Sequence, residues 1–173
     1  MKRNRDIIIA VMFLFYFSLA FAQENQSTCI VSSYFSPYDN IENVIHAQLI
    51  TASTSVHCSL YGITNKRLAD DLVALKRRGL DIAIGLDKTQ SSGPHDLGKY
   101  LKQKGIKIVV KKTSALEHNK FCIIDNNRII MGSWNWSGNA QKQDNSDVFI
   151  TGCPEQIKRF EDAFQRILKR DLQ

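Results

Sequence analysis

The sequence predicts an α/β fold with a mixed, largely parallel β-sheet that is flanked by helices on both faces. Two patterns support this prediction. Between Thr28 and Lys111, short apolar runs alternate with segments whose apolar residues recur at helical spacing, which is typical of a largely parallel sheet. Further on, two apolar runs flank Asp125-Asn126-Asn127, a turn signal that indicates a hairpin.

The boundaries of the expected elements follow from turn and capping residues. Asn40 and Thr64 are expected to cap the first two helices, and Pro154 to open a closing amphipathic helix. Between the second and the closing helix, a short helix is expected to end at Lys104. The expected strands are 28–35, 55–61, 80–86, 106–111, 120–124, 128–131 and 148–151.

The first 22 residues are expected to be a secretory signal peptide. Basic residues in the first positions precede an apolar run, which ends in Ala20-Phe21-Ala22 with small residues where a signal peptidase cleaves. Cleavage after Ala22 would leave residues 23–173 as one exported domain, periplasmic or secreted, without stable membrane association. An uncleaved membrane anchor is the alternative, although the run is short for a span of about 20 residues.

Composition and charge place the chain among globular proteins. It is 43% apolar and 23% charged, which excludes a disordered chain. The formal net charge of +6 falls to +4 when the three basic residues and one acidic residue of the first 22 are removed. A modest positive balance is compatible with an anionic substrate but does not require one.

Four cysteines remain in an exported chain: Cys29, Cys58, Cys122 and Cys153. An even number permits two disulfides, with three possible pairings. Since no Cys-x-x-Cys pair occurs, their spacing does not indicate a zinc site. Buried free thiols are the alternative for Cys58 and Cys122, because both lie in apolar, strand-like runs.

The residues that suggest chemistry lie between His118 and Asn135. On a strand, residues two apart face the same side, so His118 and Lys120 are expected to project together at the mouth of the hairpin. Ser133 and Asn135 are also two apart and can face one site. An imidazole, an ammonium, a hydroxyl and an amide would then converge, which suits an anionic phosphoryl group.

These residues resemble the HKD signature of the phospholipase D superfamily: His118-x-Lys120, Asp125 five residues later, then Gly132-Ser133-x-Asn135. Other segments resemble the small bacterial Nuc-type endonucleases, and the resemblance extends over nearly all of residues 23–173. They are Phe35-Ser36-Pro37, Ser59-Leu60-Tyr61, Lys76-Arg77-Arg78-Gly79 and Asn145-x-Asp147. The resemblance implies a phospholipase D/nuclease-like fold and a phosphodiesterase that needs neither metal nor cofactor. It also implies a homodimer, because those proteins carry one motif per chain and two motifs meet across a two-fold axis.

The resemblance further implies roles for the site residues. One His118 would attack phosphorus and form a phosphohistidine, while its symmetry mate protonates the leaving oxygen and then activates water. Lys120 and Asn135 would hold the phosphoryl oxygens, with support from Ser133. Asp147 stands where the family often has Glu, which accepts a hydrogen bond from the histidine, and the shorter side chain departs from that pattern.

Neighbouring residues carry weaker expectations. Asp125 is expected to brace the motif without touching substrate. Trp134 and Trp136 are expected in the core or in an interface, with base stacking as the alternative. Lys111-Lys112 is a candidate guide for a phosphate backbone.

The predicted function is an endonuclease that cleaves DNA, with RNA as a further candidate substrate and with little sequence preference. A phospholipase D or cardiolipin hydrolase that acts on phosphatidyl headgroups is the alternative. It would need an apolar rim facing the membrane, and residues 23–173 show no amphipathic membrane helix in their sequence. A nucleic-acid-binding module without activity is a third hypothesis, which the intact motif disfavours.

Overall fold

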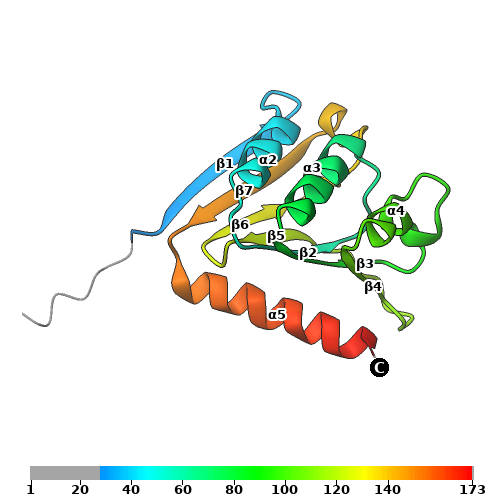
Figure 1. The fold of residues 1–173 in the computed structure, drawn as a ribbon. Coiled ribbons are helices and arrows are strands. Elements are labelled where there is room, and N and C mark those ends of the chain that lie inside the picture. The colour runs from blue at the N-terminus through cyan, green and yellow to red at the C-terminus, as the bar shows by residue number, and fades with distance from the viewer. Residues whose placement is uncertain (1–27, 173) are drawn as a thin grey trace, which may run out of the picture.

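A computed structural model describes residues 28–172, which form one seven-stranded sheet with helices on both faces (Figure 1). The strands are β1 (Ile30–Ser36), β2 (Ser55–Leu60), β3 (Asp81–Leu86), β4 (Lys107–Val110), β5 (Lys120–Ile124), β6 (Arg128–Gly132) and β7 (Asn145–Thr151). The helices are α2 (Ile41–Ile50), α3 (Lys66–Arg77), α4 (Gly98–Gln103) and α5 (Pro154–Leu172). The predicted signal peptide at residues 1–22 lies outside the described residues.

The strand order is β1-β7-β6-β5-β2-β3-β4, and the sheet is mixed. Parallel ladders join β2 to β3 and β3 to β4, whereas the four other ladders are antiparallel. The α/β class and the mixed sheet are confirmed, and β1, β6, β2, β3 and β4 run in one direction. Neighbouring strands are less often parallel than the alternation predicts, because β5, β6 and β7 lie between β1 and β2.

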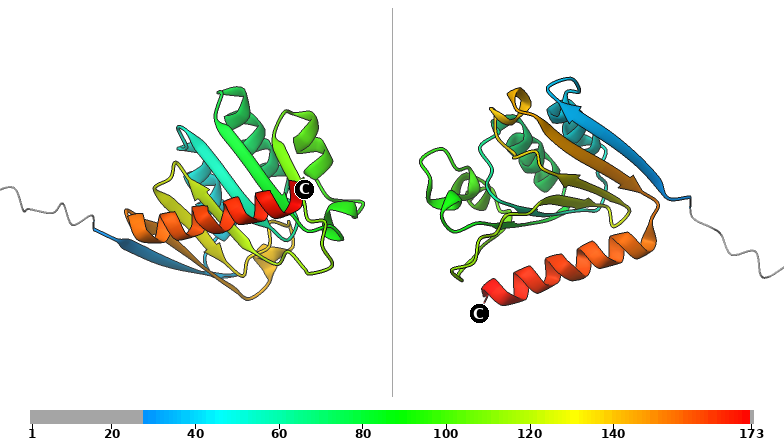
Figure 2. Two further views of the ribbon diagram at one scale, coloured as in Figure 1. Left: turned by 90° about the horizontal axis from the view of Figure 1, so that it is seen from below. Right: turned by 180° about the vertical axis from the view of Figure 1, so that it is seen from behind.

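Each face of the sheet buries its own core. Helices α2, α3 and α4 cover one face, and α5 crosses the other (Figures 1 and 2). Pro154 is the first residue of α5, as predicted, and Ile157, Phe164 and Ile167 of the predicted stripe are buried against the sheet. Each fully buried side chain of this kind contributes about 1.5–3 kcal/mol. Phe160 is only partly buried, which leaves it beside a cavity described below.

Capping agrees with the sequence at one helix and differs at the next. The side chain of Asn40 accepts the backbone N–H of Asn43 at 3.0 Å and caps α2, as predicted. At α3 the cap is Asn65, whose side chain accepts the N–H of Leu68 at 3.1 Å. The prediction of Thr64 was therefore wrong by one residue.

Two disulfides select one of the three pairings, Cys29–Cys153 and Cys58–Cys122. The alternative of free thiols at Cys58 and Cys122 is wrong. These two residues oppose each other directly in the β2–β5 ladder, so their disulfide joins the hairpin to the parallel strands. The other disulfide joins the chain just before β1 to the chain just before α5.

Both tryptophans of the motif region, Trp134 and Trp136, are buried in the core between the sheet and α2–α4. Stacking on nucleic-acid bases is therefore excluded for them, and the expected core role is confirmed. Within residues 28–172, every helix falls short of the length and apolarity needed to cross a bilayer.

Candidate active site

His118 and Lys120 lie where the chain enters β5, and the structure brings them together as predicted. The Lys120 side chain is 9% exposed, and its Nζ donates a hydrogen bond to the carbonyl oxygen of His118 at 2.9 Å. The imidazole of the exposed His118 meets the ring of Tyr61 edge-on, with 4.8 Å between centroids. Nζ of Lys120 lies 5.2 Å from the centroid of the same ring. Tyr61, at the end of β2, therefore supports both residues, a role that the sequence did not indicate.

Asp147 of β7 lies level with Lys120, with Gly132 between them. Gly132 pairs with Asp147 in the β6–β7 ladder, and the β5–β6 register places Lys120 opposite Gly132. Side chains level on neighbouring strands point to one face of the sheet, and glycine leaves the space between the two charged residues open. A Cβ at Gly132 would collide with Oδ1 of Asp147 and with the carbonyl oxygen of Ser146.

Burial governs the titration of both charged residues. Asp147 is 3% exposed, and its Oδ1 accepts the backbone N–H of Trp134 at 3.0 Å. Burial raises the pKa of Asp147 to about 6, although N–H donors at Trp134 and Ser133 and the positive charge of Lys120 act in the opposite direction. Burial lowers the pKa of Lys120, and the charge of Asp147 offsets part of that effect.

Asp147 makes no hydrogen bond to His118 within residues 28–172. Oδ1 of Asp147 instead accepts the backbone N–H of Trp134, the second residue after Gly132. The departure from the longer Glu is thus visible in the structure. Asp147 acts on Lys120 through its charge and holds the strand end through Trp134.

Ser133 and Asn135 have different surroundings. Oγ of Ser133 accepts the backbone N–H of Ser146 at 3.0 Å, which holds β6 to β7 beside Asp147. Asn135 lines a separate hollow of about 280 Å³, together with Tyr61. Tyr61 thus contacts His118 and also lines the hollow of Asn135, while the lining of the cavity beside His118 includes neither Ser133 nor Asn135.

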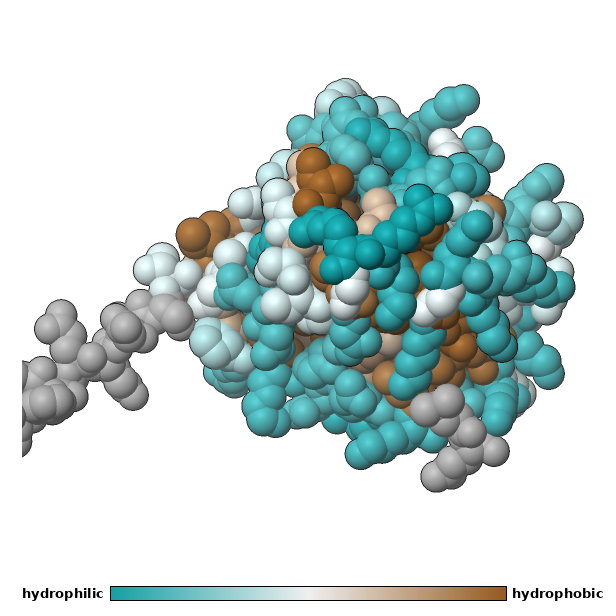
Figure 3. Space-filling view, in the orientation of Figure 1, coloured by the Kyte–Doolittle hydropathy of each residue, from teal (hydrophilic) through white to brown (hydrophobic). Residues whose placement is uncertain are grey.

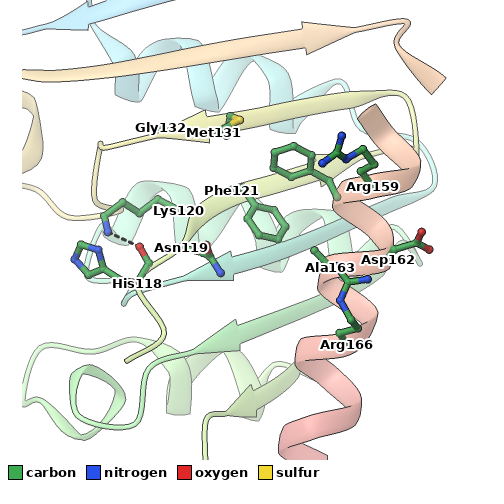
Figure 4. A pocket seen from close by; sticks show the side chains of 11 residues that line it. His118, Asn119, Lys120, Phe121, Met131, Gly132, Arg159, Asp162, Ala163 and Arg166 are labelled. Carbon is green, nitrogen blue, oxygen red and sulfur yellow. Dashed lines mark hydrogen bonds between the residues drawn. The ribbon is translucent and has the colours of Figure 1, made fainter. Parts of the chain in front are cut away.

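A larger cavity of about 620 Å³ opens beside His118 and Lys120 (Figure 4). The face of α5 that looks into it carries Arg159, Phe160 and Arg166. The two arginines are two helical turns apart, roughly 10 Å along the axis. The helix also contributes Asp162 and Ala163. The sheet side of the lining consists of Phe121, Met131 and Gly132, together with Asn119 just before β5. Neither arginine belongs to a motif of the sequence, and their only signal there is their spacing on the closing helix.

The cavity combines a positive wall with an aromatic one. The rings of Phe121 and Phe160 meet edge-on with 5.1 Å between centroids, one from the sheet and one from α5. Guanidinium groups bind phosphate through several N–H donors, and aromatic rings accept planar or apolar groups. The geometry therefore suits an anionic ligand that also carries an apolar or planar part.

Asp125 lies at the opposite end of the hairpin and does not line the cavity. Five residues of strand, roughly 17 Å, separate it from Lys120. It accepts the backbone N–H groups of Ser53, Thr54 and Ser55 at 2.7–3.2 Å. Burial acts to raise the pKa of Asp125, but these hydrogen bonds outweigh it and hold the pKa far below its usual value. The contacts hold the hairpin turn against the start of β2.

Lys111 does not match its expectation as a guide for a phosphate backbone. It is buried, and its Nζ donates a hydrogen bond to the carbonyl oxygen of Leu116 at 2.9 Å. The same Nζ lies 3.9 Å from Oε2 of Glu117. The prediction was wrong for Lys111 because the loop before His118 folds over this side chain; Lys112 is exposed.

The known proteins that this chain resembles are phospholipase D-like proteins. A family model described as "Cardiolipin synthase, PLD-like domain" matches residues 45–168. A mitochondrial cardiolipin hydrolase of Chlamydomonas reinhardtii is 30% identical over 118 residues, which cover 68% of this chain and 52% of that protein. A phospholipase D of Rickettsia bellii is 28% identical over 120 residues, 69% of this chain and 60% of that protein. The chain thus spans between half and three fifths of the length of these relatives.

Solved structures show the same fold. Nuc from Salmonella typhimurium, a phospholipase D family member, superimposes with a TM-score of 0.78 at 25% identity. The match covers 83% of this chain and 96% of Nuc. NucT from Helicobacter pylori matches with a TM-score of 0.71 at 20% identity, covering 83% and 98% of the two chains.

Replacing Asp125 with alanine is expected to lower the free energy of unfolding by about 2–4 kcal/mol, because three backbone N–H groups lose a charged acceptor. Urea unfolding measures the change. The matched control is Asp144→Ala in the exposed loop before β7, expected to change stability by less than about 0.5 kcal/mol. Equal losses in the two variants would contradict the bracing role of Asp125.

The raised pKa of Asp147 predicts a pH-dependent stability. Since the folded state holds this proton more tightly, its stabilising effect is complete below the unfolded pKa and is lost as pH rises through about 6. Asp147→Asn has no titrating group at this position. As pH rises from about 4.5 to about 7.5, the unfolding free energy of the variant should therefore increase by about 2 kcal/mol relative to that of the native protein. Urea unfolding of both proteins across this range tests it, and parallel pH profiles would contradict the assignment.

Proposed function

The chain belongs to the phospholipase D-like family, and on that premise we propose that it is a metal-independent phosphodiesterase that cleaves nucleic acid as a homodimer. One observation carries the proposal. The exposed His118 and the buried Lys120 both line a large cavity, and the ammonium of Lys120 is hydrogen-bonded to the carbonyl oxygen of His118. A nucleophile and a positive charge therefore face the same space, as phosphoryl transfer requires.

The proposed reaction has two steps. An imidazole nitrogen of His118 attacks phosphorus, the P–O bond to the leaving group breaks, and a phosphohistidine forms. A second imidazole gives its proton to the leaving oxygen. It then takes a proton from water, which attacks phosphorus and releases His118. Lys120 offsets the negative charge that grows on the phosphoryl oxygens in both steps.

The second imidazole has to come from another copy of the chain. His46 is bonded to Asp71 at 2.7 Å, and His57 lies between Glu161 and Asp81. His95 is in the loop before α4, and none of the three lines the cavity of His118. A two-fold axis beside His118 would supply the missing proton carrier, which supports the homodimer.

An apolar part of the sheet next to this cavity is the surface that we propose for dimerisation. On the α5 side of β1, Val31 and Phe35 are 58% and 53% exposed. The β1–β7 ladder pairs Val31 with Ile150 and Phe35 with Ser146. Val148 lies between these pairs on β7 and is paired with Met131, which continues the surface into the cavity. Figure 3 shows apolar side chains along α5 and near the start of β1, among hydrophilic ones. A second copy that covers this surface would bring the two His118 residues toward each other.

The cavity supports nucleic acid as the substrate. Arg159 and Arg166 lie at a spacing that suits backbone phosphates on either side of the scissile one, and Phe160 offers a ring on which a base can stack. Phospholipid is the second candidate, because Phe121, Met131, Phe160 and Ala163 form an apolar lining next to the nucleophile. Curated relatives named as cardiolipin hydrolase and phospholipase D support the same candidate.

Export to an oxidising compartment is also part of the proposal. Disulfides persist in secreted and periplasmic proteins and are rare in the cytosol. The two disulfides of the described residues support this location, together with the signal peptide expected at residues 1–22. The protein should therefore be purified and assayed without reducing agents, so that both disulfides stay intact.

The purified protein should cleave plasmid and single-stranded DNA in excess EDTA, and His118→Ala should lower the rate at least about 1,000-fold because the nucleophile is lost. The control is His95→Ala, which removes an exposed imidazole outside the cavity and should leave the rate unchanged. Cardiolipin and phosphatidylglycerol vesicles are assayed in parallel. Cleavage of lipid alone would replace nucleic acid with phospholipid, and dependence on added metal would overturn the mechanism.

Glutamate at Val31 or Phe35 should convert the dimer to a monomer and abolish cleavage, because a buried charge in the interface is costly. Light scattering after size-exclusion chromatography measures the assembly. Tyr38→Glu serves as the control, since Tyr38 is 91% exposed but lies in the loop after β1. A dimer that survives both substitutions would place the interface elsewhere.

A further inference from the structure

A buried charged cluster holds the loop of residues 112–119, which carries His118 into β5. We name this cluster the loop clamp and define it by the residues Glu117, Arg170, Asp171, Asp87 and Ser59. None of them lines the cavity beside His118. Arg170 and Asp171 belong to the last turn of α5, so the clamp joins that helix to the nucleophile loop.

Glu117 is the centre of the loop clamp. It is 3% exposed, and its Oε1 accepts hydrogen bonds from Oγ of Ser59 at 2.9 Å and Nδ2 of Asn119 at 2.6 Å. Its Oε2 accepts a guanidinium N–H of Arg170 at 3.2 Å. The backbone N–H of Glu117 donates to Oδ2 of Asp87 at 3.0 Å. A carboxylate this deeply buried is tolerated because donors from β2, from Asn119 just before β5 and from α5 satisfy it.

The last turn of α5 holds both ends of the loop. Arg170 is bonded to Glu117 at the end of the loop and also to Asp171 at 2.7 Å. Oδ1 of Asp171 accepts the backbone N–H of Lys112, at the start of the loop, at 3.3 Å. Hydrogen bonds of Arg170 to two carboxylates raise its pKa, chiefly the bond to Asp171, so the guanidinium keeps its charge.

His118 lies between two residues that are tied to one carboxylate. Glu117 supplies that carboxylate, and the side chain of Asn119 is bonded to it. The carbonyl oxygen of His118 accepts Nζ of Lys120 at the same time. The backbone of His118 is thus held from both sides, while its imidazole remains exposed against Tyr61.

We propose that Glu117 is a positioning residue, which acts through Asn119 and the last turn of α5 to hold His118 in place for its attack on phosphorus. The inference rests on the proposed function, since it concerns the nucleophile of that reaction. Displacement of a reacting group by about 1 Å can lower a rate on the order of 100-fold. Because Glu117 does not touch the cavity, its loss should act on the chemical step and not on substrate binding.

The variant Glu117→Gln tests the loop clamp with little change in volume. It removes the charge that meets Arg170 and places N–H donors where acceptors are required. We expect kcat for DNA cleavage in EDTA to fall about 10- to 100-fold while KM changes less than about twofold. Arg170→Gln breaks the same contact from a half-exposed side chain and should act in the same direction.

The matched control is Glu161→Gln. Glu161 is also a carboxylate that ties α5 to the sheet, through His57, but it lies more than two turns before Arg170. Hydrogen–deuterium exchange of residues 112–119, measured without substrate, should speed up in Glu117→Gln and Arg170→Gln and remain at the native rate in Glu161→Gln. If kcat fell equally in Glu161→Gln, the loss of activity would be explained by a general loss of stability, and the inference would be overturned.

The possible results distinguish failure of the positioning role of Glu117 from failure of the proposed function. Native kcat in both clamp variants, with or without faster exchange, would overturn the positioning role. A native protein that cleaves neither DNA nor phospholipid would overturn the proposed function instead. The exchange of residues 112–119 would then decide alone whether the loop clamp holds His118, and unchanged exchange would overturn it.

Discussion

The site depends on one electrostatic constraint, the burial of Lys120 and Asp147 on the same face of the sheet. Neither charge would be stable there alone, because burial disfavours both ionised forms. The two side chains can act on each other only because Gly132 between them has no side chain. This requirement ties β5, β6 and β7 into one register. The disulfide between Cys58 and Cys122, two residues along β5, fixes the same strand to β2.

His118, the proposed nucleophile, lies at the seam between the antiparallel and the parallel parts of the sheet. His118 and Lys120 enter with β5, while Tyr61, which contacts both, follows β2. The loop clamp adds a third element, because the last turn of α5 holds residues 112–119 through Arg170 and Asp171. A single imidazole is thus exposed on a rigid support, as a nucleophile requires.

The lining of the cavity beside His118 is compatible with two classes of substrate, nucleic acid and anionic phospholipid. Its wall on α5 carries positive charge, and its floor carries aromatic and aliphatic groups. A nucleic acid and an anionic phospholipid both combine a phosphodiester with a planar or apolar part. The chemistry that the two substrate classes share is the phosphodiester itself.

The sequence alone determined the α/β class, the hairpin of β5 and β6, the cap of α2 and the pair of His118 and Lys120, because these depend on local periodicity and on residues two apart. It also pointed to Asp147 and Ser133, through a motif whose spacing is local. The tertiary structure decided the rest: the position of β7 between β1 and β6, the disulfide pairing, the hollow that Asn135 shares with Tyr61, and the approach of Arg159 and Arg170 from a distant part of the chain. These features follow from strand order and helix packing, which bring together residues far apart in sequence and leave no periodic signal in it.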